Sequence, residues 1–146
     1  MKKIFVKDLI GNSTFDFGSV SVTEKDIIDF AEFFDPLDFH TNKDVAEKSI
    51  FKGLITSGPH IFNIFYKTKW IPLFGDSVLA GLEINSWKFL KPTYANMKVF
   101  CKVCITGIKN VKENNNVAIK WHFDFTNKNG ESLQMLDMLI LHDAKK

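Results

Sequence analysis

Asp35 and His40 are the two side chains whose types and spacing best suit acid–base chemistry. They stand five residues apart within residues 35–41, a stretch that carries a proline and no sustained periodicity. A carboxylate and a neutral imidazole can hold one water molecule, one group taking its proton while the other orients it. The same pair also occurs as a turn-capping residue and a surface histidine, so spacing alone leaves both interpretations open.

Two predicted helices flank this stretch and would present it as a short loop. Thr23 and Asp26 resemble a capping box, and apolar residues then recur at helical spacing as far as Phe34. The first helix is therefore predicted for residues 23–34, a loop for 35–41, and a short polar helix for 42–48.

A buried helix is predicted to follow the loop. The sequence Ser57-Gly58-Pro59 opens an apolar run over residues 60–70, with the proline well placed at a first helical position. The run is apolar nearly all round, which is typical of a helix inside a core. Ser57 is interpreted either as a ligand contact or as the N-cap of this helix, and the cap is favoured.

The second half of the chain predicts an antiparallel meander. Extended segments are expected at residues 78–90, 99–105, 117–126 and 132–142, with the clearest alternation in the third and a turn at 127–130. A buried helix followed by long antiparallel strands predicts an α+β fold in which the sheet wraps around the helix. Periodicity also allows a ferredoxin-like or cystatin-like layer.

Length and composition narrow the class of protein. The chain has 146 residues, 45% of them hydrophobic and 25% charged, which predicts one globular domain over residues 1–146. The net charge is +2 and the lysines are scattered, so we expect no nucleic-acid partner. With no continuous signal-peptide core and no apolar run of about 20 residues, we expect a cytoplasmic protein without a membrane span.

The cysteines and histidines give no metal-site pattern. Cys101 and Cys104 are three apart in a predicted strand, so they should point to opposite faces and serve packing, although such a pair can also suggest redox or zinc chemistry. We expect no bound metal, because no cluster has ligand spacing. His60 and His122 are interpreted as structural or surface residues, and Asp38 as a solvated loop charge.

Three segments resemble the MaoC-like hydratase/dehydratase family, of the (R)-specific enoyl-CoA hydratase type. Residues 34–40, F-D-P-L-D-F-H, resemble the family's F-D-P-x-P-F-H. Residues 51–60, F-K-G-L-I-T-S-G-P-H, resemble F-G-G-L-I-A-S-G-W-H, and residues 89–92, F-L-K-P, match the family's F-L-K-P. The sequence departs from the family at Leu37 and Asp38, which replace its Asn-Pro or proline, at Pro59, which replaces tryptophan, and at residues 94–97.

The resemblance implies a hot-dog domain that hydrates an enoyl thioester of coenzyme A or an acyl carrier, without a further cofactor. Asp35 and His40 would be catalytic, and Asp35 should accept hydrogen bonds that keep it ionised. The N–H of Gly58, beside Ser57 at the positive end of the buried helix, would stabilise the enolate oxygen. The resemblance also implies a homodimer or higher homo-oligomer with its sites at the interface.

Two other functions stay open at this stage. Hot-dog proteins also hydrolyse thioesters with a carboxylate near the same helix, and the changes at Leu37 and Asp38 suggest a non-catalytic acyl-thioester binding subunit. Four lysines could meet the phosphates of coenzyme A or a carrier arm, but scattered lysines usually form a solvated face and none is assigned. These lysines are Lys67, Lys69, Lys88 and Lys91.

Overall fold

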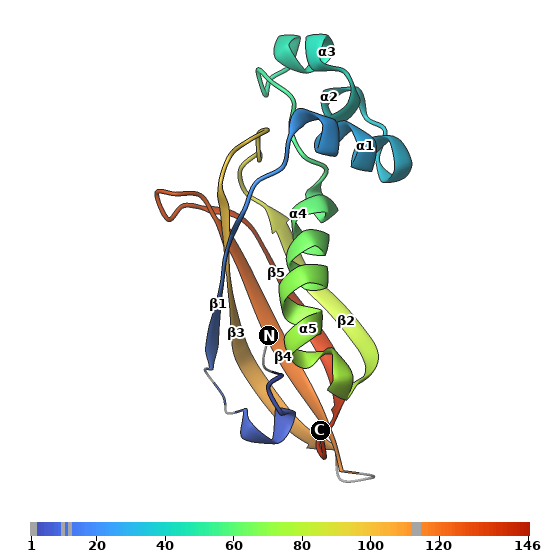
Figure 1. The fold of residues 1–146 in the computed structure, drawn as a ribbon, viewed down its shortest axis with the longest axis vertical. Coiled ribbons are helices and arrows are strands. Elements are labelled where there is room, and N and C mark those ends of the chain that lie inside the picture. The colour runs from blue at the N-terminus through green and yellow to red at the C-terminus, as the bar shows by residue number, and fades with distance from the viewer. Residues whose placement is uncertain (1–2, 10, 12, 112–114) are drawn as a thin grey trace.

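One antiparallel sheet of five strands, in the order β1-β3-β4-β5-β2, curves around a long helix (Figure 1). The structure is a computed structural model that describes residues 3–9, 11, 13–111 and 115–146. The α+β arrangement predicted from the sequence is therefore confirmed. The strands are β1 (Thr14–Val20), β2 (Val78–Phe89), β3 (Val99–Val111), β4 (Asn116–Thr126) and β5 (Ser132–Asp143).

The four later strands were predicted, whereas β1 was not. The predicted meander is wrong for the first of the four, because only β3, β4 and β5 follow one another in the sheet and β2 pairs with β5 at the edge. Phe15 and Phe17 turn toward the core, but the register against β3 shifts between Asp16 and Ser19. Gly18 lies within this bulge with φ +71°, and its N–H donates to Asp16 Oδ1 at 2.9 Å. A bulge interrupts the alternation of a strand, so the short segment carries too little periodic signal to be recognised.

The central helix is longer than predicted. It begins with α4 (Gly58–Phe65), continues through a π-helical turn (Tyr66–Trp70) and α5 (Ile71–Phe74), and ends in a 3₁₀ turn (Gly75–Ser77). Pro72 has no N–H and would disrupt a regular helix interior. Here it falls in the first turn of α5, directly after the π-helical turn, where a proline is tolerated.

Stacked aromatic rings join the central helix to the sheet. Phe62 stacks on Tyr66 with ring centroids 5.4 Å apart, and Tyr66 stacks on Trp70 at 5.1 Å. Trp70 is fully buried and meets Trp121 of β4 edge-on at 5.2 Å. Aromatic pairs in these geometries add to the burial of their apolar area, so this row anchors the helix in the concave face of the sheet.

Three short helices gather at one end of the molecule, next to the N-terminus of α4 (Figure 1). In α1 (Glu24–Phe34) the predicted capping box is confirmed, because Thr23 Oγ1 accepts from the Asp26 N–H and the Asp26 carboxylate accepts from the Thr23 N–H. The predicted α3 (Lys43–Lys48) is also present. The predicted loop at residues 35–41 is wrong in its second half, since α2 (Asp38–Thr41) forms a single helical turn there.

Cys101 and Cys104 serve packing, as predicted. Both are free thiols on β3, the first fully buried and the second half-buried. Burial raises the pKa of the Cys101 thiol far above its usual range. A thiol in such surroundings is chemically inert. In the part of the chain that the structure describes, no helix has the length and apolar character needed to cross a membrane.

His142, at the end of β5, is held as a neutral imidazole inside the core. Its Nε2 accepts from the Trp121 indole N–H at 3.1 Å, so its Nδ1 carries the hydrogen and donates to Ser77 Oγ at 2.8 Å. The Ser77 hydroxyl in turn donates to the carbonyl of Phe74 at 3.0 Å. Burial lowers the pKa of His142 to about 4.

This buried histidine predicts a stability that falls in mild acid. An unfolded chain binds a proton on histidine below a pKa of about 6.5, whereas folded His142 does so only near pH 4. Between these values the unfolded state binds more protons, so the free energy of unfolding should fall by up to about 3 kcal/mol as the pH drops from 6.5 to 4. Urea titrations of wild type and His142→Gln across this range test the effect. An equally steep pH dependence in the variant would contradict it.

Candidate active site

Asp35 ends α1 and points its carboxylate toward the start of α4. Its N–H donates to the carbonyl of Ala31 at 2.8 Å, which fixes the backbone. Its Oδ2 accepts from the hydroxyl of Ser57 at 2.7 Å and lies 3.3 Å from Nε2 of His40. The expectation that Asp35 accepts hydrogen bonds is therefore confirmed.

His40 lies on α2 with 5% of its surface exposed. Its Nδ1 is 2.7 Å from the carbonyl oxygen of Ile55, which can only accept, so Nδ1 is the donor and Nε2 of the neutral ring keeps its lone pair. Two acceptors 3.3 Å apart, this Nε2 and Oδ2 of Asp35, need a proton between them. A protonated ring supplies it, and so does a water molecule that donates to both.

Ser57 does not cap α4 with its side chain. It occupies the N-cap position and is fully buried, but its hydroxyl makes no capping bond and donates to Asp35 instead. The favoured sequence interpretation is therefore wrong. The hydroxyl donates to the Asp35 carboxylate, a charged acceptor, and its oxygen accepts no hydrogen bond from an N–H of the first turn of α4.

Gly58 is the first residue of α4, so its N–H has no partner within the helix. The ring of Phe89, at the end of β2, lies directly against this glycine. A Cβ added at Gly58 would sit 2.3 Å from Cε1 of Phe89. Only glycine permits this approach, which the sequence did not reveal because the two residues are 31 positions apart.

These groups face a pocket of about 460 Å³. Its wall is mostly apolar and comes from the α1–α3 segment, the loop before α4, the end of β2 and the start of β5. The size and lining suit a small-molecule ligand. Its lining residues are Asp35, Leu37, Phe39, His40, Phe51, Ile55, Thr56, Gly58, Pro59, Phe89, Leu90, Lys91, Pro92, Thr93, Leu133 and Gln134. Ser57 is not among these lining residues, but its hydroxyl donates to Asp35, which is.

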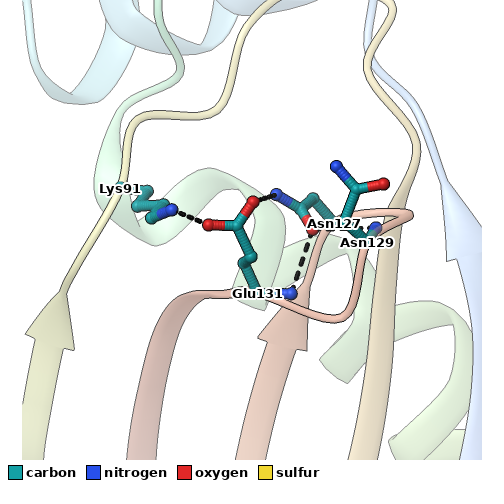
Figure 2. Close-up of polar contacts among 4 residues, drawn as sticks. All are labelled: Lys91, Asn127, Asn129 and Glu131. Atoms are coloured by element: carbon teal, nitrogen blue, oxygen red, sulfur yellow. Dashed lines mark hydrogen bonds and ion pairs between the residues drawn. The ribbon is translucent and has the colours of Figure 1, made fainter.

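The pocket wall after β2 is tied to the turn between β4 and β5 (Figure 2). Lys91 forms an ion pair with Glu131, and the N–H groups of Leu90 and Lys91 both donate to the Leu133 carbonyl, at 2.8 and 3.0 Å. Within the turn, Asn127 Oδ1 accepts from the N–H of Glu131 at 3.0 Å. Lys91 thus contacts the pocket while its charge is already partnered. Lys67, Lys69 and Lys88 are not among the pocket-lining residues.

The remaining sequence candidates make no contact with the Asp35–His40 pair. His60 is buried and stacks on Phe30 with ring centroids 4.3 Å apart, and burial lowers its pKa. His122 pairs with Asp137 across β4 and β5 at 2.9 Å. Asp38 is an exposed residue at the start of α2. All three agree with the structural or solvated roles predicted for them.

The chain is similar to known proteins in both sequence and fold. A family model described as a MaoC like domain matches residues 10–124. The uncharacterized protein YdeM of Bacillus subtilis is 38% identical over 84 residues, which cover 56% of this chain and 59% of that protein.

Solved structures share the whole fold at low sequence identity. A MaoC-like dehydratase from Rhodospirillum rubrum has a TM-score of 0.85 and 24% identity, and the match covers 96% of this chain and 97% of that one. The R-hydratase PhaJ1 from Pseudomonas aeruginosa has a TM-score of 0.72 and 16% identity, covering 92% and 83%. The predicted hot-dog fold is confirmed by these likenesses, and the chain belongs to the MaoC-like family.

Proposed function

We propose that this protein is a hydratase/dehydratase that adds water to a trans-2-enoyl thioester and forms a 3-hydroxyacyl thioester. The thioester, of coenzyme A or an acyl carrier, would occupy the pocket beside Asp35 and His40. The observation that carries the proposal is the Asp35 carboxylate, fixed by Ser57 and placed 3.3 Å from His40 Nε2 in a pocket that Gly58 also lines.

The chemistry follows from where the proton-binding atoms lie. A water bound between the carboxylate of Asp35 and Nε2 of His40 loses a proton to this pair as its oxygen bonds to C3 of the substrate. The electron pair of the double bond moves toward the thioester oxygen, where the Gly58 N–H donates to the enolate. Asp35 and His40 together then return one proton to C2 of the substrate. The addition is redox-neutral, so the proposal includes no redox cofactor.

Loss of the conjugated enoyl absorbance of crotonyl-coenzyme A tests this activity directly. If crotonyl-coenzyme A is not consumed, longer and branched enoyl thioesters follow. Release of free thiol without hydration would assign a thioesterase instead. If neither hydration nor thiol release is detected, a non-catalytic binding subunit is favoured, the function suggested by Leu37 and Asp38.

Gly58→Ala is expected to lower kcat/KM by about 10²-fold, because it shifts a pocket wall. The added methyl group meets the outer edge of the Phe89 ring, which is 59% exposed and can swing away. The helix should therefore stay in place while the pocket changes shape. Phe89→Leu added to Gly58→Ala should recover much of the loss. If the double variant is as slow as Gly58→Ala alone, ring displacement is not the cause.

We also propose that two copies associate through β2. This strand lies at the sheet edge, is exposed along nearly its whole length and carries exposed apolar side chains such as Leu79 and Ile84. A long apolar edge of this kind needs covering to avoid aggregation. A second β2 running antiparallel would continue the sheet and bring the partner close to the pocket, which the end of β2 lines.

Light scattering after gel filtration is expected to give twice the chain mass of 16.7 kDa. Leu79→Lys should shift the mass toward one chain, because it puts a charge on the proposed interface. Ile108→Lys, at an exposed position on β3, is the matched control and should leave the mass unchanged. A wild-type monomer would refute the proposed association.

A further inference from the structure

Gln134 is a buried polar residue at the end of an apolar row on β5. Every second residue of this strand faces the core, and the inward positions that follow Gln134 are occupied by Leu136, Met138 and Ile140. Gln134 itself lines the active-site pocket and has only 4% of its surface exposed. A polar side chain in such a position needs hydrogen-bond partners.

Trp87 of β2 sets the orientation of the Gln134 side-chain amide. The indole N–H lies 3.0 Å from the amide and can only donate, so the atom that faces it is the oxygen Oε1. In the part of the chain that the structure describes, the amide nitrogen Nε2 of Gln134 has no hydrogen-bond partner. The enclosed side-chain nitrogens there that lack a partner are those of His60 and Trp70, so Nε2 of Gln134 is not enclosed and opens on the pocket that this residue lines.

The Gln134 amide lies close to the proposed oxyanion donor. Gln134 is the cross-strand partner of Phe89, and such partners carry their side chains on one face of the sheet, about 5 Å apart. The ring of Phe89 in turn lies against Gly58. The N–H groups of Gln134 Nε2 and the backbone N–H of Gly58 therefore border the same pocket.

The charge of the pocket wall indicates what Gln134 would bind. Its amide is a neutral donor, which suits a carbonyl oxygen, whereas a phosphate or carboxylate is bound best by a free cation. Among the residues that line this pocket the lysine is Lys91, and its charge is already paired with Glu131. The ligand atom at Gln134 should therefore be an uncharged oxygen acceptor.

We propose that Gln134 binds the substrate by donating from Nε2 to a carbonyl oxygen of the bound thioester. The inference rests on the proposed function, which places an acyl thioester in this pocket. Such a ligand offers two carbonyl groups near its reacting end. One is the thioester carbonyl, whose oxygen becomes negative in the enolate, and the other is the nearest amide carbonyl of the pantetheine arm.

Gln134→Met tests the inference, because methionine has nearly the same size but carries no N–H. The value of kcat/KM for the most active enoyl-coenzyme A substrate should fall by about tenfold or more. A fall in kcat assigns the donor to the thioester oxygen, since that bond strengthens in the transition state. A rise in KM at unchanged kcat assigns it to the amide carbonyl, whose charge does not change during the reaction.

Trp87→Phe is the matched control, because it breaks the same hydrogen bond from the other end and keeps the donor. It should lower kcat/KM by no more than about twofold, since the Gln134 amide can still donate to the substrate. The double variant Trp87→Phe/Gln134→Met leaves neither polar group without its partner, so it should recover stability toward urea. It should nevertheless be as slow as Gln134→Met alone.

Equal losses in Gln134→Met and Trp87→Phe would overturn the inference, because the bond between the two residues would then be structural. Wild-type activity in Gln134→Met would overturn it as well, and both results leave the proposed function standing. If no enoyl thioester is hydrated, calorimetry with crotonyl-coenzyme A separates the two proposals. Binding that Gln134→Met weakens by about tenfold supports the donor without the reaction, and equal affinities or no binding by wild type overturn it.

Discussion

Asp35→Asn is expected to lower kcat/KM for enoyl-thioester hydration by about 10²–10⁴-fold, the usual contribution of a positioned acid–base group. Asparagine keeps the size of the side chain and an oxygen that can accept from Ser57, but it cannot take a proton from water. His40→Ala should cause a loss of similar size, since it removes the other proton-binding atom. Initial rates with the most active enoyl substrate measure both losses.

Two controls separate chemistry from folding. Asp38→Asn removes an exposed carboxylate three residues along the chain and should retain wild-type activity. Near-ultraviolet circular dichroism should show a native fold in every variant. If Asp35 and His40 act on one water, the double variant should be about as slow as either single one, because groups that act together are not additive. If the Asp35→Asn variant hydrates the substrate at near the wild-type rate, Asp35 takes no part in the reaction.

Trp121→Ala is expected to lower the free energy of unfolding by about 3–5 kcal/mol, a large part of the stability of a domain this size. Trp121 is fully buried on β4 and contacts the rings of Phe74 and Trp70 at centroid distances of 4.6 and 5.2 Å. Its indole N–H also donates to His142, so truncation creates a cavity and leaves a buried acceptor unpaired. Urea denaturation measures the loss.

Neighbouring substitutions show which part of Trp121 matters. Lys120→Ala, on the exposed face of the same strand, should change stability by less than about 0.5 kcal/mol. Trp121→Phe keeps most of the ring but removes the donor to His142, so its loss should fall between the two. A Trp121→Ala protein as stable as wild type would mean that the sheet closes over the missing ring.

Elements with local signals could be predicted from the sequence. The capping box at Thr23 and Asp26 marked the start of α1, and strict alternation marked β4, because both depend on residues a few positions apart. Prediction from the spacing of apolar residues failed where a single residue interrupted that spacing. Gly18 creates the bulge in β1, and the π-helical turn with Pro72 carried the helix beyond its expected end.

In the candidate site, too, the sequence indicated residues that share a short segment and missed contacts between distant ones. Asp35 and His40 were singled out because they share a short segment that resembles a family motif, since their spacing alone left both interpretations open. The partner of Ser57 was not found, since its hydroxyl reaches a carboxylate 22 residues earlier in the chain. The Ile55 carbonyl that orients His40 has no side-chain signature at all. Contacts of this kind depend on tertiary packing, which propensity and periodicity do not encode.

The π-helical turn at Tyr66–Trp70 bears on how the length of this helix can vary between related chains. Because π bonds join residues five apart rather than four, such a turn holds about one residue more than an α-helical turn. Deleting the exposed Thr68 would therefore let the turn relax to regular α-helix while the flanking segments keep their places. A one-residue gap in this helix between relatives is thus compatible with an unchanged core.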